Sequence, residues 1–334
     1  MYAETFWELA SQKYAAATAL LVTLAIPLPL VAQEHAKPRH SKLELVVLGS
    51  GGPRSFGRAS TSYLILVEGT PRILVDAGPG AFLELGKLGI DLARVDTVLL
   101  THLHIDHSGD IPAIFLDRAL TSDQPIHFKV FGPQGSGLFP STRQYLRLLF
   151  GQGGAYEYEK TFGADETVEG VDLPIALDSA ENEIVAEGDL RVREVATHHG
   201  DCPSVAYRVD YQGESITFSG DMDASAIPNL QHLAIDSDLL VFHVGVLDPP
   251  NSPEILYTLH TAPKQIGQAA RDARARHLLL SHLSPAIEES RRQVLQSIRG
   301  SYKQGTEFAY DGMRIPVLAT KPSPNPKGKS GIPR

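Results

Sequence analysis

Four potential metal ligands stand close together in this chain of 334 residues, directly after an apolar run. The run is Val98–Leu100, and the side chains that follow it include His102, His104, Asp106 and His107. Val98–Leu100 has the composition of a buried strand. Because successive side chains of an extended segment point to opposite faces, His102 and His104 project to the same side. The turn that follows can bring Asp106 and His107 to a neighbouring position. This spacing predicts two adjacent metal positions.

The ligand types indicate which metals suit these positions. Imidazole and carboxylate ligands favour zinc, with iron and manganese as the alternatives. Cys202 is the only cysteine, which excludes an internal disulfide and a cysteine-rich metal site. A histidine-rich surface turn is the competing interpretation, but such a turn needs neither a preceding apolar strand nor this spacing. We therefore expect a dinuclear site that holds two Zn²⁺, with Mn²⁺ or Fe²⁺ as substitutes.

The N-terminal segment differs from the rest of the chain. Tyr14–Ala32 is almost wholly apolar, a lysine precedes it, and Pro27 and Pro29 lie near its end. A short positive flank, an apolar stretch and a small residue at its end are typical of a secretory signal peptide. A retained membrane anchor or a buried helix is the alternative, but the prolines and the modest length argue against a full span. We predict a signal peptide over 1–33, export to the periplasm, and no stable membrane span after processing.

Beyond residues 34–42, which we interpret as a linker, segments with the periods of strands and helices alternate. Strands are expected at Leu43–Gly49, Tyr63–Val67, Arg72–Asp76, Val95–Thr101, Leu190–Thr197, Ser204–Asp210, Ser215–Ser219, Leu239–Val244 and His277–Ser281. Helices are expected at Ile111–Leu120, Ser141–Phe150, Pro263–Arg274 and Ala286–Ile298. Residues 155–187 are irregular and acidic, which indicates an inserted loop region, and the composition of the tail at 321–334 predicts disorder. Alternating elements favour an α/β architecture, with one domain over 43–320.

Ordered motifs around the ligand cluster carry a resemblance to a known family. His-x-His-x-Asp-His resembles the signature of the metallo-β-lactamase superfamily. Asp76, in Ile-Leu-Val-Asp-Ala-Gly, is similar to the family's first motif, an aspartate that supports the ligand loop. The later motifs of the family match His199, Asp221 and His282. The resemblance covers most of 43–316 and implies a single-domain, four-layer αββα sandwich of the metallo-β-lactamase type.

The resemblance also implies how the ligands divide between the metals. The first metal would be held by His102, His104 and His199, the second by Asp106, His107 and His282, and Asp221 would be shared. Each later position has an ordinary alternative. His198 adjoins His199 and could replace it, although the Gly-x-x-Pro after His199 matches the family's spacing. Asp221 alone would be a helix N-cap before Asp223, and His282 alone an ordinary histidine at a strand end.

Two further segments resemble the ribonuclease Z and arylsulfatase-like branch of the superfamily, Ala206–Val209 and Leu259–Ala262. In that branch a histidine at the position of His260 enters the active site opposite the metals and donates a proton or a hydrogen bond. Taken alone, His260 would be an ordinary residue near a helix N-terminus. Ribonuclease Z pairs this histidine with an acid, whereas Val244 stands at the acid's position here. The difference argues against the complete acid–base pair of a tRNA-processing enzyme.

These observations favour a hydrolase of an ester-type bond: a phosphodiester, sulfate ester, carboxylic ester or lactone. By the resemblance, the nucleophile is a hydroxide that bridges the metals, Asp106 orients it and His260 assists the leaving group. We expect a small anionic or ester substrate. Arg54 or Arg58 could contact its charge, although a solvated loop arginine is the ordinary role. The formal net charge of −9 and the lack of a basic arm disfavour nucleic acid as a partner. A homodimer is compatible with the sequence.

Two alternatives of different kinds stay open. One is a ribonuclease Z-like endonuclease that cleaves tRNA precursors at the 3′ end, which predicted export and Val244 disfavour. The other is a non-catalytic metal-binding protein that kept the fold. Degenerate relatives usually lose ligands, whereas every ligand position is filled here. A true β-lactamase is disfavoured because such enzymes normally lack the bridging aspartate, and Asp221 is present.

Overall fold

The computed structural model describes residues 41–54, 56–121, 125–161 and 166–318. The predicted signal peptide, most of the predicted linker and the predicted disordered tail lie outside these residues. Within the described ranges, no helix is both long and apolar enough to cross a membrane.

The first sheet has seven strands in the order β14-β1-β2-β3-β4-β5-β6. Its strands β14, β1, β2 and β3 pair antiparallel, and β3 to β6 pair parallel. Their bounds are β1 (Leu43–Gly49), β2 (Ser62–Val67), β3 (Thr70–Ala77), β4 (Thr97–Leu99), β5 (Ile126–Pro133), β6 (Glu166–Leu173) and β14 (Arg314–Val317).

The second sheet repeats this plan, in the order β13-β12-β11-β10-β9-β8-β7. Strands β7 to β10 pair antiparallel, and β10 to β13 pair parallel. Their bounds are β7 (Asn182–Glu187), β8 (Leu190–His199), β9 (Cys202–Tyr211), β10 (Glu214–Phe218), β11 (Leu239–His243), β12 (His277–Ser281) and β13 (Gly305–Phe308).

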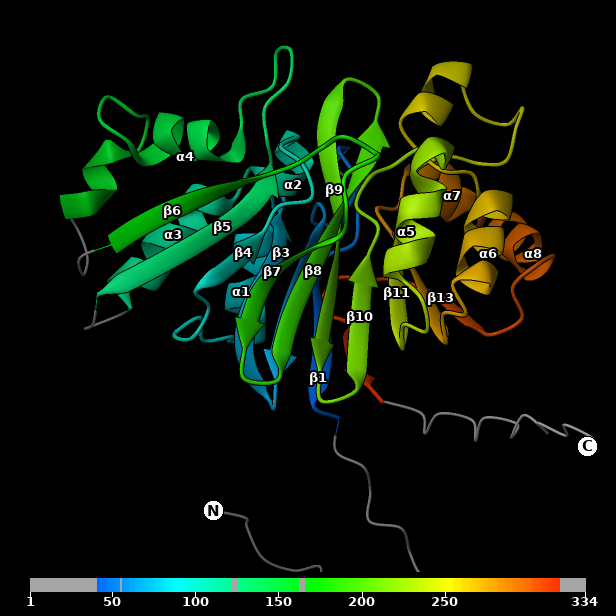
Figure 1. The fold of residues 1–334 in the computed structure, drawn as a ribbon, viewed down its shortest axis with the longest axis horizontal. Coiled ribbons are helices and arrows are strands. Elements are labelled where there is room, and N and C mark those ends of the chain that lie inside the picture. Colours follow the sequence, from blue (N-terminus) through cyan, green and yellow to red (C-terminus); the bar gives the residue numbers. More distant parts are fainter. Residues whose placement is uncertain (1–40, 55, 122–124, 162–165, 319–334) are drawn as a thin grey trace, which may run out of the picture. The chain divides into compact units, whose positions relative to one another are not determined.

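Helices cover the outer face of each sheet, and one apolar core lies between the sheets (Figure 1). The first sheet packs against α1 (Ala81–Leu88), α3 (Ile111–Leu120) and α4 (Thr142–Phe150). The second packs against α5 (Ile227–Leu233), α6 (Pro263–Asp272), α7 (Pro285–Glu289) and α8 (Arg291–Arg299). The short elements α2 (Ile105–Ser108), η1 (Glu157–Thr161), η2 (Ala224–Ala226) and η3 (Glu254–Thr258) lie in connections. The predicted αββα sandwich is confirmed.

The structure corrects two details of the predicted organisation. The inserted loop expected at 155–187 contains β6 and β7, the edge strands of the two sheets. An edge strand needs little apolar surface; in β7 only Val185 is buried, so no apolar run marks it. The single helix expected at Ala286–Ile298 is divided into α7 and α8 at Ser290, whose backbone (φ −113°) leaves the helical range.

Candidate metal centre

The loop after β4 presents its ligands because a buried aspartate anchors it. Asp76, at the end of β3, accepts hydrogen bonds from the Thr101 backbone N–H (2.7 Å) and hydroxyl (2.8 Å). Its Oδ2 also lies 2.8 Å from Nδ1 of His107. A carboxylate that accepts the Nδ1 proton fixes the imidazole tautomer with Nε2 free. Nε2 of His107 is buried and has no hydrogen-bond partner among the described residues.

The second sheet supplies three ligand candidates from the ends of alternate strands. His199 ends β8, Asp221 follows β10, and His282 follows β12. Nδ1 of His199 donates to the Leu259 carbonyl over 2.7 Å, which turns Nε2 towards the site. His282 has a left-handed backbone (φ 59°), which is uncommon for a residue with a side chain. Its ring lies so close to Gly52 that a Cβ there would be 2.8 Å from Cε1, so this loop position requires glycine.

The side chains form two groups with the spacing of metal ligands. In the first group, Nδ1 of His104 lies 3.1 Å from Nε2 of His102 and 3.3 Å from Nε2 of His199. In a tetrahedral zinc site with Zn–N bonds of about 2.0–2.1 Å, neighbouring nitrogens are about 3.3 Å apart. In the second group, Oδ2 of Asp106 lies 3.2 Å from Nε2 of His282 and 3.6 Å from Nε2 of His107.

Asp221 lies between the two groups. Its Oδ2 is 3.1 Å from Nε2 of His282, 3.6 Å from that of His107 and 3.8 Å from that of His199. Burial opposes ionisation, but the imidazoles of His282 and His107 hold the pKa of Asp221 well below its usual range. The structure therefore brings all seven predicted ligand positions to one place, with a carboxylate where a shared ligand would be.

The donor set fits divalent cations. Burial, and then the neighbouring His107, lowers the pKa of His102 well below its usual value, and burial also lowers the pKa of His199. Both rings are therefore neutral at physiological pH, the form in which imidazole binds a metal. The unpartnered Nε2 of His107 is costly in a buried site unless a cation satisfies it.

His260 faces the two groups from the loop between η3 and α6. Its Nδ1 lies 3.9 Å from Oδ2 of Asp221, and its ring centroid is 5.4 Å from that of His199 and 5.3 Å from that of His282. The ring packs on Gly245, where a Cβ would be 2.9 Å from three ring atoms. Burial lowers the pKa of His260 to about 3, so the neutral ring can donate one hydrogen bond. Its Nδ1 is buried without a hydrogen-bond partner among the described residues.

Comparison with known proteins agrees with this geometry. The model of the Beta-lactamase superfamily domain matches residues 71–283, more than half of the chain. The chain belongs to the β-lactamase superfamily. Ribonuclease Z of Mycobacterium avium (strain 104) is 29% identical over 291 residues, covering 83% of this chain and 99% of the relative. Ribonuclease Z of Mycobacterium marinum is 27% identical over 288 residues, covering 83% and 99%.

Solved structures show the same fold. The short form of human tRNase Z superimposes with a TM-score of 0.63 at 20% identity, covering 82% of this chain and 99% of that one. The metallo-β-lactamase fold protein YhfI from Bacillus subtilis gives 0.59 at 18% identity, covering 82% and 98%. With the superfamily match and the ligand groups, this chain is a metal-dependent hydrolase of the metallo-β-lactamase fold, and the fold implies divalent metal ions.

For three of the residues that match superfamily motifs, the sequence also allowed an ordinary role, and the structure shows how each of these residues is placed. His198 turns away from the ligand groups: its Nδ1 lies 2.7 Å from Asp223, and 45% of its side chain is exposed. Asp223, not Asp221, caps η2 by accepting a hydrogen bond from the Ser225 backbone (2.8 Å). His282 is buried within the second group and does not stand alone at its strand end.

One buried histidine beside the superfamily site was not assigned a role from the sequence. Nδ1 of His243 lies 2.9 Å from Oδ1 of Asp221, the carboxylate oxygen that faces away from the ligand groups. Its Nε2 lies 3.0 Å from the hydroxyl of Tyr63, on β2 of the other sheet. The available signal was a histidine that ends an otherwise wholly apolar strand, Leu239–Phe242.

The two arginines of the loop after β1 have different environments. Arg58 is held by Glu288 (2.5 Å) and donates to the Ser50 hydroxyl (2.6 Å), so it braces the loop. Arg54 is exposed, and its guanidinium lies 4.7 Å from the centre of the Phe56 ring. Of the two, Arg54 is the one available to a substrate.

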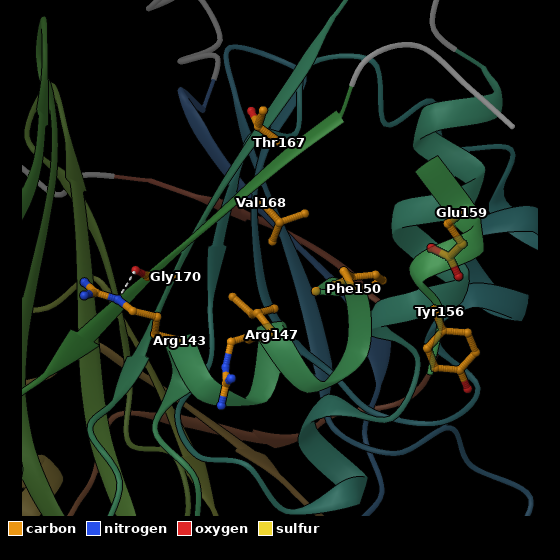
Figure 2. A pocket seen from close by; sticks show the side chains of 10 residues that line it. Arg143, Arg147, Phe150, Tyr156, Glu159, Thr167, Val168 and Gly170 are labelled. Carbon is orange, nitrogen blue, oxygen red and sulfur yellow. Dashed lines mark hydrogen bonds between the residues drawn. The ribbon is translucent and has the colours of Figure 1, made fainter. Parts of the chain in front are cut away.

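A separate hollow of about 410 Å³ lies between α4 and β6 (Figure 2). Its floor is apolar and includes Phe150 and Val168, and Arg143 turns aside to donate to the Gly170 carbonyl (3.3 Å). None of the possible ligand groups among the described residues lies in it. This hollow is therefore distinct from the candidate metal centre.

Proposed function

We propose that this hydrolase is a zinc-dependent phosphodiesterase of the ribonuclease Z type that cleaves RNA. The sequence placed this function second, behind a general ester hydrolase. The observation that carries it is the position of His260, whose Nδ1 lies 3.9 Å from Oδ2 of Asp221 and whose ring lies beside His199 and His282. Mycobacterial ribonucleases Z that match over 83% of the chain give it further support.

Under this proposal, His102, His104 and His199 would hold one cation, and Asp106, His107 and His282 would hold the other. Asp221, whose Oδ2 lies near His282 and His199, would be shared between them, and His243 contacts its Oδ1. At such a site, two divalent cations supply a hydrolytic nucleophile at neutral pH and neutralise charge on the scissile phosphate.

The remaining chemistry belongs to two side chains. The ionised carboxylate of Asp106 can accept a hydrogen bond from the attacking water and orient it towards phosphorus. The neutral ring of His260 donates its single N–H to the phosphate oxygen that gains charge as the bond to the leaving group breaks. No acid at position 244 is available to protonate the ring, because Val244 is buried in the apolar core.

The test is cleavage of a tRNA precursor with a 3′ extension, with bis(p-nitrophenyl) phosphate as a small phosphodiester. We expect the zinc-loaded full chain to cleave both and to lose activity with EDTA. His260→Ala should lower kcat by about a hundredfold to a thousandfold, whereas His232→Ala, at a side chain that is 75% exposed, should have no effect. Turnover of lactones or carboxylic esters, with neither phosphodiester cleaved, would exclude the proposal.

A second candidate is a hydrolase of small anionic esters, such as phosphodiesters or sulfate esters. Val244 at the acid's position and the net charge of −9 favour it over cleavage of a large RNA. This candidate predicts turnover of bis(p-nitrophenyl) phosphate or an aryl sulfate while the tRNA precursor stays intact.

A further inference from the structure

A cavity of about 420 Å³ adjoins the first ligand group and has no role in the chemistry described above. One wall is the loop Ser136–Phe139 between β5 and α4, and the other is Thr197–Pro203, which comprises the end of β8, the turn and the start of β9. Because His199 belongs to this lining, whatever fills the cavity lies directly beside the metal centre. The volume is in the range of ligand-binding pockets.

Apolar groups are concentrated on the loop side. The backbones of Ser136 and Phe139 bond each other (3.2 and 2.9 Å), forming a tight turn that leaves Leu138 fully exposed. The ring of Phe139 is partly buried and lies edge-on to His104, with centroids 5.6 Å apart. Ile175 also lines the cavity. Solvent-exposed apolar side chains beside a reaction centre are typical of a surface that binds a ligand.

Polar groups lie on the turn side, and they carry no fixed positive charge. His198 is tied to Asp223 through Nδ1, which leaves its other nitrogen free to contact a ligand. The carboxylate of Asp201 is exposed and forms no ion pair with any residue that the structure describes. No lysine or arginine is among the described lining residues. The carboxylate disfavours a phosphate here and favours a neutral ring with N–H donors on its edge.

We propose that this cavity binds the nucleobase of a nucleotide next to the scissile phosphodiester. The base stacks on Phe139, and its edge contacts Asp201 and His198. The inference rests on the proposed phosphodiesterase function and adds the requirement for a base at one defined position. A nucleobase has apolar faces and a polar edge, which match the apolar loop side of the cavity and its polar turn side. Stacking on an aromatic side chain is possible for any base.

The experiment compares Phe139→Ala with Leu148→Ala, which removes an exposed apolar side chain (54%) from α4 outside the cavity. Each zinc-loaded variant is assayed on a short RNA and on matched RNAs that lack one base beside the cleavage site. Phe139→Ala should raise KM for the intact RNA about tenfold and leave KM for the abasic RNA unchanged. Phe139→Trp should restore the wild-type KM, and Leu148→Ala should change neither value.

The abasic control separates stacking from an indirect effect through His104, which would alter kcat on both RNAs equally. Equal losses on both RNAs, or wild-type KM values that do not depend on the base at any position, would overturn the inference and leave the phosphodiesterase function intact. A wild-type protein that cleaves no phosphodiester would overturn the proposed function, and the inference with it.

Discussion

The two halves of the metal centre are built in different ways. The first sheet contributes His102, His104, Asp106 and His107 from one loop, within six consecutive residues. The second sheet contributes His199, Asp221 and His282 from three strand ends that are separated by tens of residues. Strand order places these ends together, because β8, β10 and β12 alternate in one sheet. The first half is thus specified by local sequence, and the second by topology.

Asp221 is the proposed shared ligand of the two metal positions, so removing it should have the largest effect. Asp221→Ala would take a ligand from both positions, whereas the double variant His102→Ala/His104→Ala would take ligands from the first position only. We expect Asp221→Ala to lose both metals and all turnover, and the double variant to lose one metal and all turnover while still folding. Metal content by mass spectrometry, with circular dichroism as the folding control, measures this. If Asp221→Ala kept two metals, the carboxylate would not be shared.

Asp76 in the first sheet and His243 in the second each contact a candidate ligand from outside the ligand groups, so variants of the two allow a matched comparison of the halves. Asp76→Asn weakens the support of His107 and Thr101 in the first sheet, and His243→Gln weakens the support of Asp221 in the second. Each should lower metal affinity by about tenfold to a hundredfold. Asp76→Asn should have the larger effect because Asp76 makes three contacts to the ligand loop. Titration against a chelator measures both.

Tyr63→Phe sharpens this comparison because it removes only the hydroxyl that contacts His243. Its effect on metal affinity should be smaller than that of His243→Gln. An affinity unchanged by both variants would mean that the second half needs no orienting contact beyond its strands.

The smallest effect is expected at Glu194, a buried residue of β8 outside the ligand groups. Burial raises the pKa of its carboxyl to about 7, and Asn182 donates to Oε1 over 2.7 Å. Because the folded-state pKa lies above the unfolded value, its contribution is full below about pH 4.5 and is lost as pH rises through about 7. Glu194→Gln should therefore raise Tm by about 2–4 °C at pH 8, with little change at about pH 4 and no change in metal content. An equal shift at both pH values would exclude titration as its cause.

The elements that the sequence predicted well are those with strong apolar patterns. Leu43–Gly49 and Ile111–Leu120 were expected at the bounds that the structure gives. Strands β6 and β7 were interpreted as a loop because an edge strand that is half exposed carries few apolar residues. The expected strand Val95–Thr101 is shorter in the structure, at Thr97–Leu99, because its last residues already form the ligand loop.

The candidate site was likewise predicted in part from the sequence. Spacing and motif order were enough to name His260 and the seven ligand positions, which the structure brings together. Neither could show that Tyr63 contacts His243 across two sheets, or that Arg58 braces a loop while Arg54 stays exposed.

By itself, the sequence determined the cluster of candidate ligands after Val98–Leu100 and the buried central strands, because both depend on side-chain type and local period, and motif order added the other candidates. Only the tertiary structure decided which oxygen of Asp221 faces the ligands, which histidine holds the other oxygen, and where a cavity opens beside His199. Hydrogen bonds and cavities depend on directions and distances in space, and these exist only once the two sheets have packed together.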